Sequence, residues 1–311
     1  MPDPDQDLAF MQLLPDETAA TLSRLEWLSR GKMEGAIAGR HASPFKGFSA
    51  EFAEHRQYAQ GDDLRNLDWR AYGKSDRYYI KQYVDETNLR ATIVLDCSGS
   101  MAYRGDEAAA AGGEPCSKFR YGQFLAAALA YLFIRQRDAA GLVTFDTQVR
   151  EYLPAASRPA QVRHILEKLH RSEPGGETAA ADVLHEVAER IPRRGLVLLI
   201  SDLFDTPEKI APALHHFRHR RHEVAVFHVM AEEELTFPFK KFNNFRSLEV
   251  PDTLLKIDPK SVRKAYLDHV GKFLKEVEKA CGQIGADYVP ARTKRRYDET
   301  LAEYLTKRRL G

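Results

Sequence analysis

Residues 91–101 read ATIVLDCSGSM, an apolar run that ends in a polar turn. Apolar runs of this length that are rich in β-branched residues are typical of strands buried on both faces of a sheet. We therefore expect a strand over 91–96, with Asp96, Ser98 and Ser100 at its carboxyl end. This is the edge of an open α/β sheet at which ligands bind. One carboxylate and two hydroxyls are hard oxygen donors, and they favour Mg²⁺ or Mn²⁺ over zinc.

Strand and helix signals alternate along the rest of the chain. They predict buried strands at 141–145, 195–202, 224–229 and 286–290, and helices at 118–137, 158–171, 179–191, 207–220, 260–281 and from 297 onward. Residues 148–153 are predicted as an antiparallel edge strand, and 231–257 as irregular. Regular β–α alternation implies right-handed crossovers. The predicted fold class is therefore α/β, with a doubly wound, mostly parallel sheet and helices on both faces.

The chain divides into three predicted segments, namely a helical lead-in, a smaller N-terminal α+β subdomain and the α/β domain, at residues 1–45, 46–90 and 91–311. In the lead-in, a helix is expected to begin near Asp16 and continue through Leu28. In the subdomain, a short helix is expected over 64–72 and a strand over 78–84. We interpret the subdomain's many charged side chains as ion pairs that fix its packing, with a catalytic role as the alternative.

Composition limits the classes of function. The chain has 311 residues, of which 43% are hydrophobic and 29% charged, and its net charge of +1 gives no electrostatic reason to expect nucleic-acid binding. Its three widely spaced cysteines indicate isolated thiols in a reducing compartment. The longest apolar run, 124–134, is shorter than the roughly 20 residues that span a bilayer, and the acidic N-terminus does not look like a signal peptide. We predict a cytoplasmic protein with neither a membrane nor a nucleic acid as partner.

Two further polar turns are expected at the edge that carries Asp96. Residues 175–178 read GGET, so that Thr178 follows two glycines and precedes a predicted helix. Ser201 and Asp202 end the buried strand predicted at 195–202. The D-x-S-x-S sequence, a later loop threonine and an aspartate at a strand end together resemble the metal-ion-dependent adhesion site of von Willebrand factor A domains.

That resemblance implies a division of roles among the five residues. Ser98, Ser100 and Thr178 would bind a Mg²⁺ or Mn²⁺ ion directly, while Asp96 and Asp202 would hold its water molecules. An ion with so few anionic ligands keeps an open position. An Asp or Glu side chain of another protein would fill that position, because hard cations favour carboxylate oxygen.

A second resemblance covers the chain from about residue 45 to its C-terminus. Residues 56–69 match the pattern R-x-Y-x-x-G-D-D-x-R-x-x-D-W. This pattern is similar to the signature of a bacterial family known as domain of unknown function 58. The resemblance implies work beside a MoxR-type AAA+ ATPase, in a chaperone-like or complex-assembly role. An Ala- and Gly-rich insert at 105–114 departs from the family pattern.

These observations favour a non-enzymatic, metal-dependent protein-binding module, an adaptor or assembly factor whose partner is a MoxR-type ATPase or its client. The alternative is a metal-dependent hydrolase or phosphatase in which Asp96 is the nucleophile. Haloacid-dehalogenase-like phosphatases need a second aspartate two residues further on, where this chain has Ser98. The sequence also lacks a Gly-x-Ser-x-Gly elbow and a Walker A loop. Histidines 215, 216, 219 and 222 have helical spacing but no acidic cluster beside them, which disfavours a zinc site.

Overall fold

The computed structural model describes residues 10–22, 25, 27, 50–57, 69, 72–73, 78–85, 89–105, 116–176, 180–192, 194–240, 243–249 and 254–310. The chain forms two compact units. One contains residues 1–28 and 90–311, and the other contains residues 29–89. Each is described separately below.

The smaller unit contains an antiparallel strand pair. Strand β1 (Ala50–Gln57) pairs with β2 (Tyr79–Asp85), and the register shifts between Phe52 and Glu54. The strand predicted over 78–84 is confirmed as β2, whereas β1 was not predicted. Most of the helix predicted over 64–72 lies outside the described residues.

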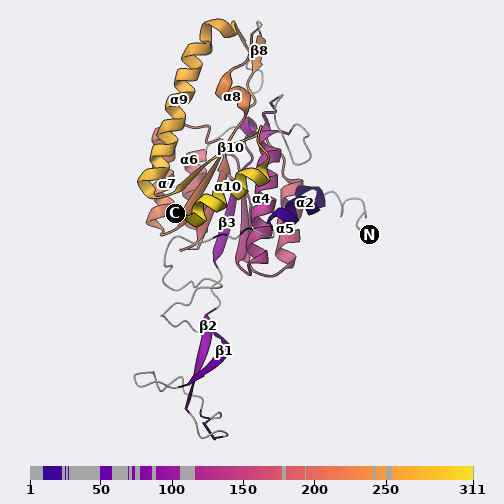
Figure 1. Cartoon of the computed structure of the whole chain (residues 1–311). Coiled ribbons are helices and arrows are strands. Elements are labelled where there is room, and N and C mark those ends of the chain that lie inside the picture. Colours follow the sequence, from indigo (N-terminus) through magenta and orange to yellow (C-terminus); the bar gives the residue numbers. More distant parts are fainter. Residues whose placement is uncertain are drawn as a thin grey trace. The chain divides into compact units, whose positions relative to one another are not determined.

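A six-stranded sheet forms the centre of the larger unit (Figure 1). Its strand order is β10-β7-β6-β3-β4-β5. The bounds are β3 (Arg90–Asp96), β4 (Ala139–Phe145), β5 (Val149–Ala156), β6 (Leu196–Ser201), β7 (Glu223–Met230) and β10 (Asp287–Arg292). All neighbours are parallel except β5, which runs antiparallel to β4 at the edge. The predicted mostly parallel sheet and its antiparallel edge are both confirmed.

Helices cover both faces of this sheet (Figure 1). Their bounds are α2 (Asp16–Leu22), α4 (Lys118–Arg135), α5 (Ala160–Arg171), α6 (Ala180–Arg190), α7 (Pro207–His219), α9 (Pro259–Ile284) and α10 (Tyr297–Leu310), with single-turn helices η1 (Phe10–Leu13) and η3 (Gly99–Ala102). Helices α6, α7 and α9 share one apolar core with the strands, and α4 packs on β3, β4, β6 and β7. The predicted α/β class with helices on both faces is confirmed.

The apolar run 124–134 lies in α4, which is buried on nearly every side because α5 and α10 cover the face that the sheet leaves free. This agrees with its interpretation as a buried helix. Among the described residues, no helix combines the length and the hydropathy that crossing a bilayer requires.

The order of the strands creates a point of divergence beside β3. The chain passes from β3 to β4 on one side and later to β6 on the other. At such a topological switch point the connections leave in opposite directions, and a crevice opens at the carboxyl ends of the two strands. Asp96 is the last residue of β3 and Ser201 the last of β6. The strand order therefore places the predicted polar turns together.

Residues 231–257 are more regular than predicted. They contain a short helix, α8 (Glu232–Thr236), and a hairpin of β8 (Asn243–Arg246) and β9 (Leu254–Ile257). We call this segment the arm. Within the arm the ring centroids of Phe239 and Phe245 lie 5.3 Å apart, and Phe237 packs on α9, with its ring centroid 4.6 Å from that of Tyr266. Such tertiary ring contacts have no sequence period, which is why this segment gave no secondary-structure signal.

The first helix is shorter than predicted. Helix α2 ends at Leu22, and neither Leu25 nor Trp27 is helical. The Trp27 ring instead packs against Phe133 and Tyr304, with centroids 5.3 and 5.4 Å away. Trp27, one of the apolar residues whose spacing predicted a longer helix, is therefore buried by packing onto the larger unit.

We expect two buried histidines to destabilise the fold as the pH drops from about 6.5 to 4. Burial, above all, lowers the pKa of both His222 and His228 to about 4. An unfolded chain takes up these protons near pH 6.5, so it binds more protons than the folded chain between the two values, and stability is complete only above that window. Each ring should contribute about 2 kcal/mol of lost stability between urea unfolding at pH 7 and at pH 4.5. Burial raises the pKa of Asp96 to about 7, and this carboxyl acts in the opposite direction because the folded chain takes up its proton first.

The control for this pH dependence is His222→Asn. Its side-chain oxygen can still accept the hydrogen bond that the Gly195 N–H donates to the His222 ring, but it does not titrate. The variant should lose less stability between the two pH values than the wild type. Equal losses would contradict the assignment to His222.

Candidate functional site

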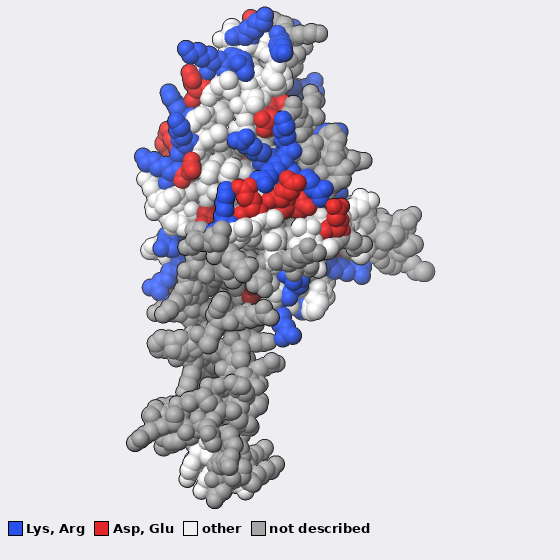
Figure 2. All heavy atoms as spheres, viewed as in Figure 1, with Lys and Arg blue, Asp and Glu red and all other residues white. Residues whose placement is uncertain are grey.

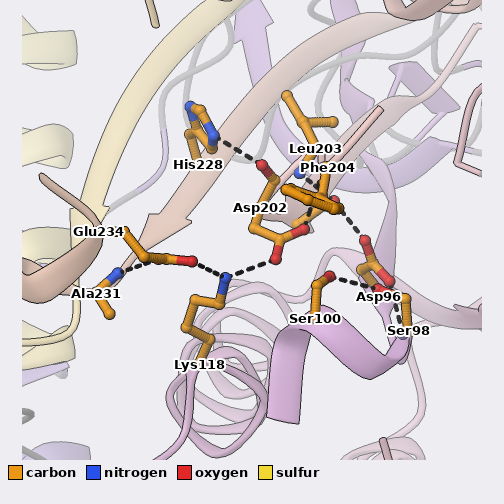
Figure 3. Close-up of polar contacts among 11 residues, drawn as sticks. Asp96, Ser98, Ser100, Lys118, Asp202, Leu203, Phe204, His228, Ala231 and Glu234 are labelled. Carbon is orange, nitrogen blue, oxygen red and sulfur yellow. Dashed lines mark hydrogen bonds and ion pairs between the residues drawn. The ribbon is translucent and has the colours of Figure 1, made fainter. Parts of the chain in front are cut away.

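Asp96 is held in a fixed orientation at the end of β3. Its side chain is fully buried. Its Oδ1 atom accepts a hydrogen bond from the Ser98 N–H at 2.8 Å, and its Oδ2 atom accepts one from the Ser201 hydroxyl at 2.5 Å (Figure 3). The end of β6 therefore positions the carboxylate that ends β3.

The two predicted serines point toward each other. Ser98 has extended backbone geometry and precedes η3, which contains Ser100. Their hydroxyl oxygens lie 3.1 Å apart, and both residues are buried. Neighbouring ligands of an octahedral ion with Mg–O bonds of about 2.1 Å lie about 3 Å apart. The two hydroxyls are hydrogen-bonded to each other, and the same spacing is compatible with two adjacent ligands of Mg²⁺.

Gly99 lies where three loops meet. Its N–H donates to the Gly176 carbonyl at 2.9 Å, and the Gly175 N–H donates to the Cys97 carbonyl at 2.9 Å. A Cβ atom at Gly99 would lie 2.8 Å from the Gly176 carbonyl oxygen and would also clash with that of Leu248. Only a glycine therefore permits this approach. The described part of this loop ends at Gly176, and Thr178, predicted as a metal ligand, lies outside the described residues.

Asp202 follows β6 and is almost fully buried. Its Oδ1 atom accepts a hydrogen bond from the Phe204 N–H at 3.2 Å. Its backbone carbonyl accepts one from the His228 ring at 2.9 Å. Asp96, Ser98, Ser100 and Asp202 are thus brought together, as predicted, at the carboxyl ends of β3 and β6 (Figure 3).

The electrostatics of this cluster are dominated by two buried carboxylates. Burial, followed by the nearby negative charge of Asp202, raises the pKa of Asp96 to about 7, and hydrogen bonds from Ser201 and Ser98 offset only part of this rise. The shift arises mainly because burial disfavours the charged form of a carboxylate whose hydrogen-bond donors, Ser98 and Ser201, are neutral. A divalent cation near the two serines would supply compensating positive charge. The residues present therefore fit a Mg²⁺ or Mn²⁺ ion.

Lys118 is a member of the cluster that the sequence did not indicate. It is the first residue of α4 and is 1% exposed. Its ammonium group donates hydrogen bonds to Asp202 Oδ2 and to Glu234 Oε1, both at 2.7 Å (Figure 3). Burial disfavours the charged form, but the two carboxylates outweigh it and raise the pKa of Lys118. Lys118 is therefore a permanent cation beside the candidate site.

Glu234 connects this cluster to the arm. Besides accepting from Lys118, its side chain accepts a hydrogen bond from the Ala231 N–H at 2.8 Å, which caps α8. Lys118 had no signal in the sequence, since a lysine at a helix start is ordinary, and Glu234 lies in the segment predicted as irregular. His228 had a signal, as a polar residue inside the apolar strand EVAVFHVM.

Among the described residues, no group of three or more His, Cys, Asp or Glu side chains is arranged to hold a metal ion. A site rich in nitrogen, sulfur or carboxylate ligands is therefore not found in that part of the chain. The candidate site depends instead on serine hydroxyls with carboxylates behind them.

The family model described as "Protein of unknown function DUF58" matches residues 54–272. The chain belongs to this family. The membership predicted from residues 56–69 is therefore confirmed. Uncharacterised proteins of Mycobacterium bovis and Mycobacterium tuberculosis are each 24% identical to this DUF58 protein, over 94% of its length and 90% of theirs.

Solved structures of similar fold include the conserved hypothetical protein BatB from Bacteroides thetaiotaomicron. It is 15% identical, with a TM-score of 0.41, over 72% of this chain and 100% of that one. An aerotolerance-related membrane protein from Bacteroides fragilis is 17% identical, with a TM-score of 0.43, over 71% and 100%. The SpRpn10 VWA domain is 11% identical, with a TM-score of 0.38, over 69% and 95%.

Proposed function

We propose that this DUF58 protein is a non-enzymatic, metal-dependent protein-binding module. Ser98, Ser100 and Thr178 would hold a Mg²⁺ or Mn²⁺ ion, and Asp96 and Asp202 would accept hydrogen bonds from its water molecules. The ion would supply an electrophilic position for an Asp or Glu side chain of a partner protein. The observation that carries this proposal is the pair of serine hydroxyls, 3.1 Å apart, beside two buried carboxylates.

Exposed apolar side chains beside the site support a protein as the partner. Phe204 is 62% exposed, and its backbone is hydrogen-bonded to Asp202. Leu248 is 47% exposed, and its carbonyl oxygen abuts Gly99. Large apolar side chains that stay exposed around a polar centre are typical of protein-binding surfaces.

The exposed basic side chains around β8 and at the start of α9 support an acidic partner. Figure 2 shows Lys and Arg side chains around β8 and the start of α9, and the exposed ones there include Lys240, Arg246, Lys256, Lys260 and Lys264. A basic surface beside a site for a carboxylate favours acidic partners and speeds their association. A MoxR-type AAA+ ATPase or its client, in the cytoplasm, is the partner we propose.

The geometry of Asp96 does not favour the alternative of a hydrolase or phosphatase. A carboxylate nucleophile must reach its substrate, but Asp96 is fully buried. Both of its oxygens accept hydrogen bonds, from Ser98 and Ser201. We therefore assign Asp96 a positioning role.

The proposal predicts that the double variant Ser98→Ala/Ser100→Ala binds Mn²⁺ at least about tenfold more weakly than the wild type, because two ligands are lost. Calorimetric titration of MnCl₂ into protein cleared of metal by EDTA and dialysis measures this. Ser157→Ala, at an exposed loop serine, is the control and should bind as the wild type does. Equal affinity in the double variant, or no binding by the wild type, would refute the metal site.

The same variants test the partner. The purified MoxR-type ATPase of the source organism should bind the wild type in MgCl₂, and EDTA or the double serine substitution should abolish the complex. A complex that forms equally well in EDTA would show that the partner does not use the ion.

A further inference from the structure

Lys118 lies where it can oppose a metal ion at the candidate site. In Figure 3 its side chain reaches Asp202 from α4, while Ser100 and Asp96 lie on the other side of the same carboxylate. The ammonium group is buried and bonded at 2.7 Å to Asp202 Oδ2. One carboxylate therefore faces both a built-in cation and the position proposed for a divalent ion.

This pairing weakens the attraction of Asp202 for any other cation. The Lys118 charge neutralises much of the field of Asp202, and both carboxylate oxygens already accept hydrogen bonds, from Lys118 and from the Phe204 N–H. In a buried environment such charges are poorly screened, so the effect on a nearby ion is large. The carboxylate of Asp96, which is held only by hydrogen bonds from neutral donors, does not have this restraint.

Glu234 makes a charge-matched test possible. Lys118, Asp202 and Glu234 together carry a formal charge of −1. Replacing Lys118 by methionine and Glu234 by glutamine removes one positive and one negative charge, so the sum stays −1 while Asp202 loses its ammonium partner. The glutamine oxygen can still accept the hydrogen bond from the Ala231 N–H that caps α8.

We propose that Lys118 competes with the divalent ion for Asp202 and thereby sets the ion affinity of the site to a low value. The proposal rests on the proposed function, because it concerns the regulation of that same metal site. A site of low intrinsic affinity retains its ion well only when the carboxylate of a partner adds a further ligand. Lys118 would thus make the binding of the ion depend on the partner.

Calorimetric titration of MnCl₂ into EDTA-treated and dialysed protein tests this, with wild type, Lys118→Met/Glu234→Gln and Glu234→Gln. We expect the double variant to bind Mn²⁺ about tenfold more tightly than the wild type. Glu234→Gln alone, which keeps the Lys118–Asp202 pair, should bind no more tightly. Thermal unfolding in EDTA reports whether each variant is folded, and Lys118→Gln/Glu234→Gln replaces the double variant if that one does not fold.

The outcomes separate this proposal from the proposed function. If the wild type binds Mn²⁺ and the double variant binds no more tightly, Lys118 has only a structural role and the proposal is overturned, while the metal site stands. If Ser98→Ala/Ser100→Ala, added to the double variant, leaves its tighter binding intact, the ion binds elsewhere and the proposal also fails. If no variant binds Mn²⁺, the proposed function itself fails.

Discussion

Replacing Arg308 by methionine should lower the free energy of unfolding by about 3–5 kcal/mol, because it removes the buried guanidinium that forms ion pairs with two partly buried carboxylates. The Arg308 side chain is 1% exposed and forms ion pairs with Glu223 and Asp287. Its guanidinium also lies 4.6 Å from the centre of the Trp27 ring. One side chain of α10 therefore joins the first residues of β7 and β10 to the N-terminal segment.

Urea unfolding measures this loss, and Lys307→Met is the matched control on the same helix. Lys307 is paired with Glu303 but is 74% exposed, and exposed pairs contribute at most about 1 kcal/mol. Adding Glu223→Gln and Asp287→Asn to Arg308→Met should recover much of the loss, since the two carboxylate charges are then removed together with the guanidinium. A loss as small as that of Lys307→Met would contradict the prediction.

Arg308→Met should leave Mn²⁺ affinity unchanged in the folded protein. The Arg308 cluster lies at the amino ends of β7 and β10, whereas Asp96 and Asp202 lie at the carboxyl ends of β3 and β6. The two charge clusters thus lie at opposite ends of the strands of one sheet. The end that carries Arg308 joins chain segments, and the end that carries Asp96 is the one at which we propose that the ion binds.

The sheet could be predicted because its signals are local. Strands buried on both faces require unbroken apolar runs such as LVLLIS in β6, and the helices between them are amphipathic or wholly apolar. The hairpin of β8 and β9 could not be predicted, because its strands are short and partly exposed. The prediction that the first helix continues through Leu28 was wrong for a related reason. The apolar residue Trp27 is buried by tertiary packing and not on the face of a helix.

The candidate site could be predicted only where it follows a strand. Asp96 and Asp202 each come directly after an apolar run, and parallel strands bring their carboxyl ends to one edge, so their proximity follows from the fold. Lys118 and Glu234 reach the same place from a helix start and from the arm. Their ion pairs join residues far apart in the chain, and a single sequence carries no periodic or local mark of such a pair.

Replacing Gly99 by alanine should weaken Mn²⁺ binding about a hundredfold, although it removes no proposed ligand. The added Cβ would lie 2.8 Å from the Gly176 carbonyl oxygen and would clash with the Leu248 carbonyl oxygen as well. These are backbone atoms, which cannot turn aside as the end of a flexible side chain can. Relief requires the three loops to separate, and the Gly99–Gly176 hydrogen bond is then lost.

Gly175→Ala is the matched control, one residue away in the facing loop. A Cβ at Gly175 would meet no heavy atom of the described residues within 4 Å, so this variant should bind Mn²⁺ as the wild type does. Calorimetric titration of both variants, with near-ultraviolet circular dichroism to show that each is folded, decides the matter. If Gly99→Ala binds as tightly as Gly175→Ala, the close approach of the loops does not matter for the ion. That result would contradict our proposal that the contact between Gly99 and the 175–176 loop supports the serine pair in holding the ion.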